Sequence, residues 1–208
     1  MTEKLIRVAE GEINVCEPKG DDKYIKYYNK TGGMNFDMNV AWCAIFVTWC
    51  KAMAGIGKDI IPHFASCDIG KEWFEKRNLY KKSRSYGGEY RPKRGDIIFF
   101  SSKYTQNDAT HVGIVTSVSG NAVSTIEGNT SDCVARRSYS LNSKYIIGYA
   151  SPAYINCYET YCVKKGDSLW KIAKNMLGSG MRYSEIMALN NMESAIIHPG
   201  DVLYLPRV

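Results

Sequence analysis

Residues 41–55, with the sequence AWCAIFVTWCKAMAG, are apolar on almost every side of the helix that their spacing predicts. A helix without a polar face has to be surrounded by protein, so this chain must build a core around it. Gly55 is a natural end for the helix, because glycine readily adopts the left-handed conformation found at helix C-termini. The stretch therefore predicts a globular domain with one buried helix.

The rest of the first 153 residues divides into helical patterns followed by strand patterns. A second, amphipathic helix is expected from residue 66, with Ser66 as its cap. After Gly95, short apolar runs typical of strands follow one another, separated by turn residues; they lie at 96–100, 111–118, 122–127, 133–137 and 146–149. Helices followed by a run of antiparallel strands indicate an α+β domain.

A second pattern of elements begins near residue 160. We expect residues 154–159 to form a linker between a first domain at 1–153 and a second at 160–208. Within 160–208 the order is a short strand, a helix, a second helix and a closing strand, that is, a small βααβ unit. About fifty residues make a small core for an independent domain.

Cys43 lies at the start of the buried helix. The partial positive charge and unpaired N–H groups of a helix N-terminus stabilise a thiolate, the form of cysteine that attacks carbonyl carbons. The same N–H groups can hold the oxyanion that develops during attack. Cys50 lies seven residues further on nearly the same face and is expected to pack in the core. Cys43 on its own is more simply explained as another core residue.

His111 opens the strand at 111–118 and favours a catalytic role for Cys43. If residues 119–121 form a three-residue loop, the antiparallel ladder sets His111 opposite Asn129, with Glu127 on the same face. A two-residue loop would reverse that relation. The three-residue loop thus predicts a base beside two polar groups that could orient it, which together with a cysteine is the general arrangement for acyl transfer.

These motifs resemble the CHAP family of cysteine, histidine-dependent amidohydrolases/peptidases. The resemblance rests on AWCAIFVTWC, ATHVGIV and IEGN and covers roughly residues 5–153. The motifs RPKRGDIIFF, RRSYSL and IIGYASPAY resemble the clostridial and phage branch of the family. It implies a papain-like fold in which helices pack on an antiparallel sheet. It also implies that Cys43 is the nucleophile and His111 the general base, with Glu127 orienting the imidazole and Asn129 supporting it.

Residues 160–206 resemble a LysM module, a domain that binds glycans containing N-acetylglucosamine. The resemblance rests chiefly on GDSL at 166–169, LN at 189–190 and PG at 199–200. By this resemblance the glycan groove lies between two loops, and its expected residues are Gly166, Asp167, Ser168, Leu169, Ile196 and Ile197. Leu169 is also expected to be a core residue.

The seven cysteines contain no CxxC pair, and no residue pattern predicts a metal site. Residues 17–30 lack the alternating Asp/Asn-Gly pattern of a calcium loop, so we expect no required metal or other cofactor. The odd count, without a secretion signal, favours reduced thiols. A disulfide between Cys157 and Cys162 is a less favoured alternative. His63 and His198 lie beside prolines and are expected to have no catalytic role; Asn39 is a weak candidate for the oxyanion site.

The net charge of +6 comes partly from a basic stretch at 76–94, in which Glu89 is the one acidic residue. A solvated loop explains it most simply, and attraction to an anionic wall polymer is the alternative. No nucleic-acid-binding motif accompanies it, so nucleic acid is not an expected partner. No apolar run is long enough to span a membrane. The N-terminus lacks the apolar region of a signal peptide.

Together these features predict a monomeric peptidoglycan hydrolase with two contacts to one polymer: the stem peptide at the CHAP domain and the glycan at LysM. The bond is either the N-acetylmuramoyl–L-alanine amide or a peptide bond of the stem or cross-bridge. We expect synthesis in the bacterial cytoplasm and action on the cell wall, as in a phage endolysin released through a holin; a tail-associated lysin is an alternative. A wall-binding protein with an inactive CHAP fold is the competing hypothesis.

Overall fold

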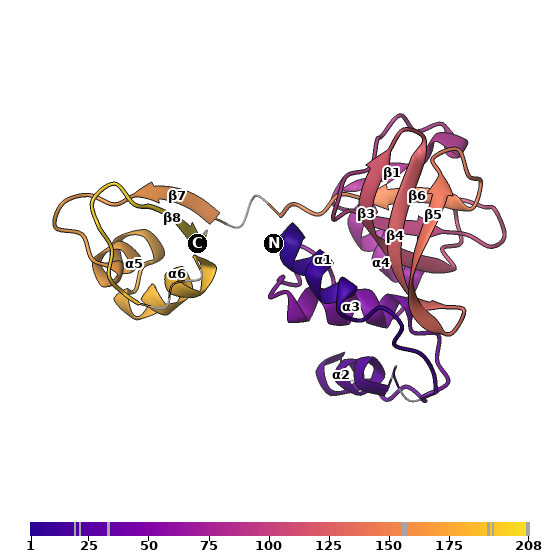
Figure 1. The fold of residues 1–208 in the computed structure, drawn as a ribbon, viewed down its shortest axis with the longest axis horizontal. Coiled ribbons are helices and arrows are strands. Elements are labelled where there is room, and N and C mark those ends of the chain that lie inside the picture. The colour runs from indigo at the N-terminus through magenta and orange to yellow at the C-terminus, as the bar shows by residue number, and fades with distance from the viewer. Residues whose placement is uncertain are drawn as a thin grey trace. The chain divides into compact units, whose positions relative to one another are not determined.

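A computed structural model describes residues 1–18, 20, 22–32, 34–154, 158–190, 192 and 194–206, with only the backbone of Tyr158. The chain separates into two compact units, Met1–Pro152 and Ala153–Val208 (Figure 1). Strand β7 begins at Tyr158, so the last two residues of the expected linker 154–159 belong to a strand. Each unit is described by itself below.

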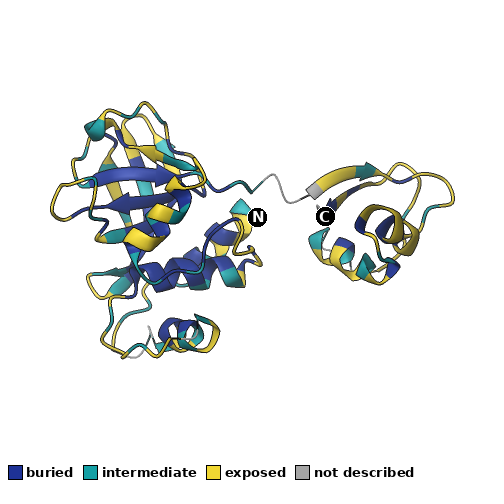
Figure 2. Cartoon of the chain, turned by 180° about the vertical axis from the view of Figure 1, so that it is seen from behind, coloured by how far each residue is buried: buried dark blue, intermediate teal, exposed yellow. Residues whose placement is uncertain are grey.

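The first unit begins with four helices, α1 (Thr2–Glu10), α2 (Asp22–Gly32), α3 (Cys43–Met53) and α4 (Cys67–Glu75). Helix α3 is the buried helix that the apolar stretch predicts, and it appears mostly dark blue in Figure 2. It contacts α1, α2 and the strands β3 (His111–Ser119) and β4 (Ala122–Thr130). Ser66 caps α4 by accepting a hydrogen bond from the N–H of Ile69. Contacts with β3 and β4 hold α3 beside the sheet.

Six antiparallel strands form one sheet, in the order β1-β6-β2-β3-β4-β5. The remaining bounds are β1 (Tyr80–Lys82), β2 (Ile97–Phe100), β5 (Cys133–Ser140) and β6 (Ile146–Ala150), with a 3-10 turn, η1, at Arg84–Tyr86. Every residue of β2 and β6 is buried, as expected for strands inside a sheet. Helices packed on an antiparallel sheet confirm the α+β class.

The turn between β3 and β4 differs from the expected three-residue loop. Ser119 pairs with Ala122, so the turn contains two residues, and the loop prediction is wrong. A glycine at φ +53° and an asparagine form this turn. Both are residue types that two-residue hairpin turns favour. Such a turn, taken alone, would move His111 and Glu127 to opposite faces.

A bulge in β3 reverses this effect. The register shifts between Val115 and Ser117, so Thr116 is an extra residue in β3 without a partner in β4. Beyond the bulge, Ile114 pairs with Ile126. Continuing that register sets His111 opposite Asn129, the relation that the three-residue loop would also produce. The one-residue shortening of the turn and the one-residue bulge cancel.

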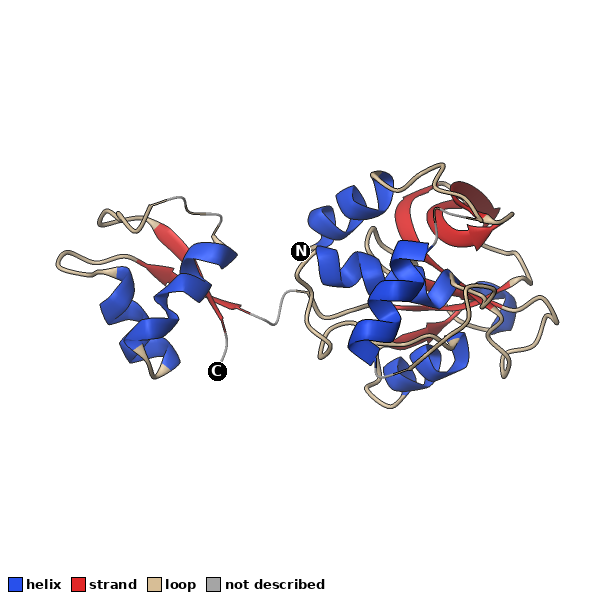
Figure 3. Cartoon of the chain, turned by 90° about the horizontal axis from the view of Figure 1, so that it is seen from below, coloured by secondary structure: helices blue, strands red, loops and turns tan. Residues whose placement is uncertain are grey.

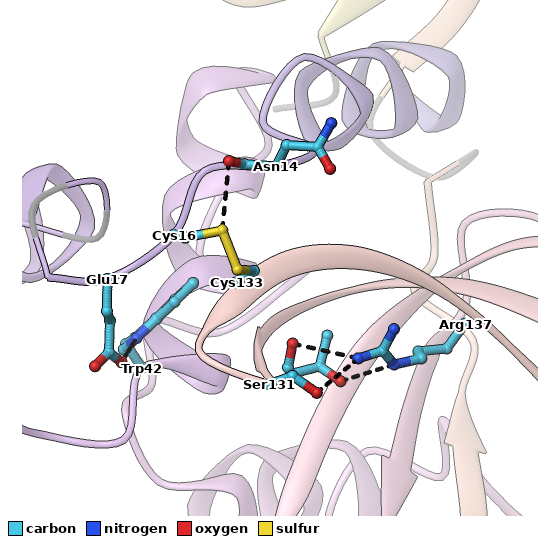
Figure 4. Close-up of a disulfide and its surroundings, with 8 residues drawn as sticks. Asn14, Cys16, Glu17, Trp42, Ser131, Cys133 and Arg137 are labelled. Carbon is cyan, nitrogen blue, oxygen red and sulfur yellow. Dashed lines mark hydrogen bonds between the residues drawn. A yellow bond between two sulfur atoms is a disulfide. The ribbon is translucent and has the colours of Figure 1, made fainter.

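A disulfide joins Cys16 to Cys133 across 117 residues of sequence (Figure 4). The segment around Cys16 also pairs with β5, since Asn14 donates to the carbonyl of Val134 and Val134 donates to that of Val15. The expectation of reduced thiols throughout is therefore wrong for this pair, because long-range pairing of the N-terminal segment cannot be read from cysteine spacing. Among the described cysteines, four are free: Cys43, Cys50, Cys67 and Cys162.

The second unit has the expected βααβ order. Its elements are β7 (Tyr158–Cys162), α5 (Leu169–Leu177), the 3-10 turn η2 (Gly180–Arg182), α6 (Tyr183–Leu189) and β8 (Val202–Pro206). The two helices pack on each other beside the antiparallel β7–β8 pair (Figure 3). Its core contains Val163, Leu169, Ile172, Ala173, Leu177, Ile186, Leu203 and Leu205. Cys157, of the alternative Cys157–Cys162 disulfide, lies outside the described residues.

Over the described residues, no helix combines the length and the apolar character needed to cross a lipid bilayer.

Candidate active site

Cys43 is the first residue of α3, and only 4% of its surface is exposed. The N–H groups of a first helical turn lack partners within the helix and point toward its N-terminus. The preceding residue, Trp42, is fully buried, and its indole N–H donates to Oε1 of Glu17 at 2.6 Å (Figure 4). Glu17 adjoins the disulfide-bonded Cys16, so the backbone just before Cys43 is linked to the N-terminal segment.

His111 begins β3, opposite the end of β2, where it pairs with Phe100. Its side chain is 13% exposed, and Nε2 lies 2.9 Å from Oε2 of Glu127. With Nε2 occupied by the carboxylate, Nδ1 is the ring nitrogen left for the Cys43 thiol. His111 thus interacts with both Cys43 and Glu127, which is the order of groups that the general triad arrangement requires.

Glu127 is fully buried, and three donors surround its carboxylate. The hydroxyl of Thr125, two residues back on the same strand, donates to Oε1. The hydroxyl of Tyr139, from β5, donates to Oε2 at 3.2 Å, beside His111. Buried charges persist in proteins when they are paired and hydrogen-bonded, so these groups hold a carboxylate in place beneath the imidazole.

Cys43 and His111 shift each other's pKa in the directions that favour an ion pair. A hydrogen bond from Cys67 lowers the pKa of Cys43 most; burial opposes this, and the hydrogen bond and positive charge of His111 lower it further. Burial lowers the pKa of His111, but hydrogen bonds and charge from Cys43 and Glu127 outweigh it and raise that pKa to about 9. Both directions favour a thiolate–imidazolium pair, and the thiolate is the nucleophilic form.

Comparison with known families assigns both units. The CHAP domain matches residues 35–129, a range that contains Cys43, His111 and Glu127. The LysM domain matches residues 161–206. This chain carries a CHAP domain and a LysM domain.

Solved structures offer more distant likenesses. "The crystal structure of Ly7917" is 16% identical over 78% of this chain, with a TM-score of 0.42. "The crystal structure of Ly7917 with the hydrolyzing product of MDP" is also 16% identical over 78% of this chain, with a TM-score of 0.43. This chain spans 66% of the length of either structure. A MoCVNH3 variant in complex with (N-GlcNAc)4 is 19% identical over 44% of this chain and 59% of its own, with a TM-score of 0.22. No curated protein matches the sequence.

Of the residues predicted for the CHAP site, His111 and Glu127 are in direct contact, and Asn129 is not. The backbone of Asn129 is left-handed, with φ +53°, and the register of β4 against β5 is irregular there. Within the described part of the chain, Asn129 makes no hydrogen bond to His111. Strand alternation does not govern its side chain, so its supporting role stays a prediction.

The weak oxyanion candidate Asn39, and the two histidines expected to be non-catalytic, contact other groups. Asn39 is exposed, and its side-chain N–H donates to Oδ1 of Asp37. His63 stacks on Tyr28 with ring centroids 4.4 Å apart. His198 is exposed beside Asp201. Over the described residues, no group of three or more His, Cys, Asp or Glu side chains is placed to hold a metal ion.

Three contributors to the site are not among the predicted residues. Thr125 could have been found, because it lies two residues from Glu127 on the same strand face. Tyr139 comes from the next strand, and its contact depends on the β4–β5 register. Cys67 comes from α4, and its Sγ lies 3.6 Å from that of Cys43. No local pattern in the sequence indicates that approach.

In the LysM domain, several predicted groove residues maintain the fold of their loop. Asp167 accepts hydrogen bonds from the N–H of Lys164 and the hydroxyl of Tyr161, both at 2.8 Å. Ser168 caps α5, and Leu169 is buried in the core with 2% of its surface exposed. Gly166 has φ +89°, a conformation that favours glycine.

The first predicted loop follows β7, and the second precedes β8. Ile196 is 71% exposed, whereas Ile197 packs partly against the core. The two loops adjoin, because Gly200 donates to the carbonyl of Val163 and Val163 donates to that of Asp201.

Proposed function

We propose that this protein is a peptidoglycan hydrolase whose CHAP domain cleaves an amide or peptide bond with Cys43 as the nucleophile. The observation that carries the proposal is that His111 interacts with both Cys43 and Glu127, with its Nε2 2.9 Å from Oε2 of Glu127. Burial of a charged carboxylate is costly unless it is paired and hydrogen-bonded, and three donors meet that of Glu127. Cysteine and histidine side chains whose pKa values are shifted as in Cys43 and His111 gather at catalytic sites.

The arrangement supports a two-step acyl transfer. The Cys43 thiolate attacks the carbonyl carbon, and the negative charge on the carbonyl oxygen develops near the N–H groups that open α3. His111 then donates the proton on its cysteine-facing nitrogen to the departing amine, leaving a thioester on Cys43. A water molecule, deprotonated by His111, hydrolyses the thioester and releases the carboxylate product. Glu127 keeps the ring oriented and stabilises its charged form throughout.

The LysM domain binds the polymer. The resemblance of this module to glycan-binding LysM domains supports N-acetylglucosamine-containing strands as its ligand. The proposed contact lies between the loop at 166–169 and the loop at 195–199. A weak second contact raises the local concentration of the catalytic domain at an insoluble substrate. Two modules directed at one polymer, with the stem peptide at the CHAP domain, explain why they share a chain.

The bond is proposed as a class: the N-acetylmuramoyl–L-alanine amide, or a peptide bond of the stem or cross-bridge. Both present a carbonyl to a thiolate and release an amine, so the same catalytic residues serve either. The biological role that fits is bacteriolysis by a phage or prophage endolysin. The competing hypothesis, a wall-binding protein with an inactive CHAP fold, does not account for the interactions of His111 with Cys43 and Glu127.

A turbidity assay tests the proposal. Purified protein should clear a suspension of Gram-positive cell walls, and Cys43→Ala should abolish clearing while leaving wall pelleting unchanged. Equal clearing by the variant would remove Cys43 from the mechanism, and no clearing by either would favour the binding-only hypothesis. Mass spectrometry of the fragments then separates the two bonds, since an amidase frees lactyl groups and N-terminal alanine, whereas an endopeptidase creates new peptide termini elsewhere.

A further inference from the structure

The candidate nucleophile has a second cysteine as its neighbour. The Sγ atoms of Cys43 and Cys67 are 3.6 Å apart, both thiols are free, and both residues are buried, with 4% and 8% of their surfaces exposed. Each is the first residue of a helix, α3 and α4 respectively. The acyl-transfer steps described above form no bond to Cys67, so its approach to the nucleophile calls for a separate explanation.

The approach is built into the surrounding structure. In the segment before Cys67, the carbonyl of Phe64 accepts a hydrogen bond from the Thr48 hydroxyl of α3 at 2.7 Å, and the N–H of Phe64 donates back to that hydroxyl at 3.1 Å. After Cys67, Oδ1 of Asp68 accepts from the N–H of Ala109 at 2.7 Å, in the loop that leads to His111. Cys67 is thus fixed both to the helix of Cys43 and to the loop before the base.

Packing of α4 adds a further restraint. A Cβ placed on Gly70 would come within 2.4 Å of the Phe64 ring, so this ring lies directly against the α4 backbone. The helix therefore has little freedom to draw Cys67 away from α3. Two sulfurs held this close need only modest side-chain adjustment to reach bonding distance.

We propose that Cys67 is a resolving cysteine: under peroxide, Cys43 and Cys67 form a reversible disulfide that switches the active site off and protects Cys43 from irreversible oxidation. This is a modification site, and the class of oxidant it takes is a hydroperoxide. The formation of the bond stands on the position of the two sulfurs. The switching of activity rests on the proposed function of Cys43 as nucleophile.

The chemistry balances in two steps. The Cys43 thiolate attacks one peroxide oxygen, the O–O bond breaks, and the hydroxide that leaves takes the proton of the His111 imidazolium, giving a sulfenic acid and water. The Cys67 sulfur then attacks the sulfenic sulfur, the S–O bond breaks, and the departing hydroxide leaves as water with the Cys67 proton. Two thiols are oxidised to one disulfide, and one hydroperoxide is reduced.

Charge at the site favours this order of events. While Cys43 is a thiolate, the Cys67 thiol donates a hydrogen bond to it; this bond, burial and the adjacent negative charge all raise the pKa of Cys67. Cys43 is therefore the cysteine that reacts with the hydroperoxide. Conversion of Cys43 to the neutral sulfenic acid removes that negative charge and frees Cys67 to attack. A dithiol reductant reverses the disulfide by thiol exchange.

Cys50 provides an internal comparison within α3. It is fully buried, and burial raises its pKa well above the ordinary value. It should stay reduced under the same treatment, because the thiolate is the reactive form. Cys16 and Cys133 are already bonded to each other, and Cys162 is exposed.

The experiment treats the full-length protein with hydrogen peroxide, carrying Cys157→Ser and Cys162→Ser to remove the thiols of the second unit. Peptide mapping should yield a Cys43–Cys67 linked peptide, with Cys50 still alkylatable. Wall clearing should fall with the appearance of that peptide and return with dithiothreitol. In the same background, Cys67→Ser should accumulate sulfinic and sulfonic acid on Cys43. After dithiothreitol, the wall clearing of this variant should not return to the level of the untreated variant. Cys50→Ser should behave like the parent.

Peptide mapping also separates this proposal from the proposed function. A linked peptide without any wall clearing would support the disulfide and refute the hydrolase. Two results would overturn the resolving role. One is a loss of wall clearing while Cys67 remains alkylatable. The other is the formation of sulfinic acid on Cys43 of the parent protein at the rate seen in Cys67→Ser.

Discussion

Nε2 of His111 lies 2.9 Å from Oε2 of Glu127, and the carboxylate that receives it is fully buried. This contact orients the imidazole, because a ring nitrogen bonded to a carboxylate leaves the other nitrogen for the thiol. It also stabilises the imidazolium, which in turn holds the Cys43 thiolate.

Glu127→Gln should reduce kcat/KM for wall cleavage by roughly 100-fold or more, since a positioned acid–base partner contributes about that much. The amide keeps the shape but removes the charge that favours the imidazolium. Initial rates on a soluble muropeptide measure the effect. Glu89→Gln, at an exposed position, is the matched control and should retain activity. Similar rates for both variants would exclude Glu127 from the site.

Tyr139→Phe should reduce kcat/KM by roughly 10-fold or more, because it removes one hydrogen bond of about 1.5–3 kcal/mol to the charged carboxylate. The ring and its packing on Phe100 remain. Tyr86→Phe removes a comparable hydroxyl donor, to the carbonyl of Lys144, and should leave the rate unchanged. A wild-type rate for Tyr139→Phe would show that this donor does not position Glu127.

Activity should follow a bell-shaped pH profile set by the Cys43–His111 pair. The active form needs the thiolate, which is lost as pH falls through the lowered pKa of Cys43. It also needs the imidazolium, which is lost as pH rises through the raised pKa of His111, about 9. The two limbs belong to the coupled pair. The rate of Cys43 alkylation by iodoacetamide tests the ion pair. A rate that stays low until the pH reaches the ordinary pKa of cysteine would falsify it.

Replacing both Cys16 and Cys133 by serine should lower the free energy of unfolding of the first unit by about 2–4 kcal/mol, because the bond closes a long loop in the unfolded chain. Urea denaturation under oxidising conditions measures it. Cys162→Ser, at an exposed free cysteine, serves as the control and should leave the midpoint unchanged. An unchanged midpoint for the double variant would mean that the bond contributes no stability.

Removing residues 154–208 should weaken pelleting with cell walls more than it changes cleavage of a small soluble muropeptide. The reason is that LysM raises local concentration only on a polymer that both domains can reach. The first unit retains its own core and its complete candidate site without these residues. Equal losses in both assays would indicate that the second unit supports the catalytic domain itself.

Local patterns in the sequence were sufficient for much of this protein. The apolar residues of 41–55 determine a buried helix, because no polar face is available to meet water. Glycine and asparagine mark the position of the turn between β3 and β4, but the bulge is also needed before His111 and Glu127 share a face. The second unit follows its own short-range order of elements.

Long-range contacts were decided only in the folded chain. The bulge at Thr116 restores the register that the two-residue turn would have broken, and it depends on how β3 meets its neighbours. The approach of Cys67 to Cys43 and the Cys16–Cys133 bond join segments far apart in sequence. Periodicity reports which face of an element is buried, but it carries no information on which distant side chain lies opposite. That choice is made by packing, when the elements close on a common core.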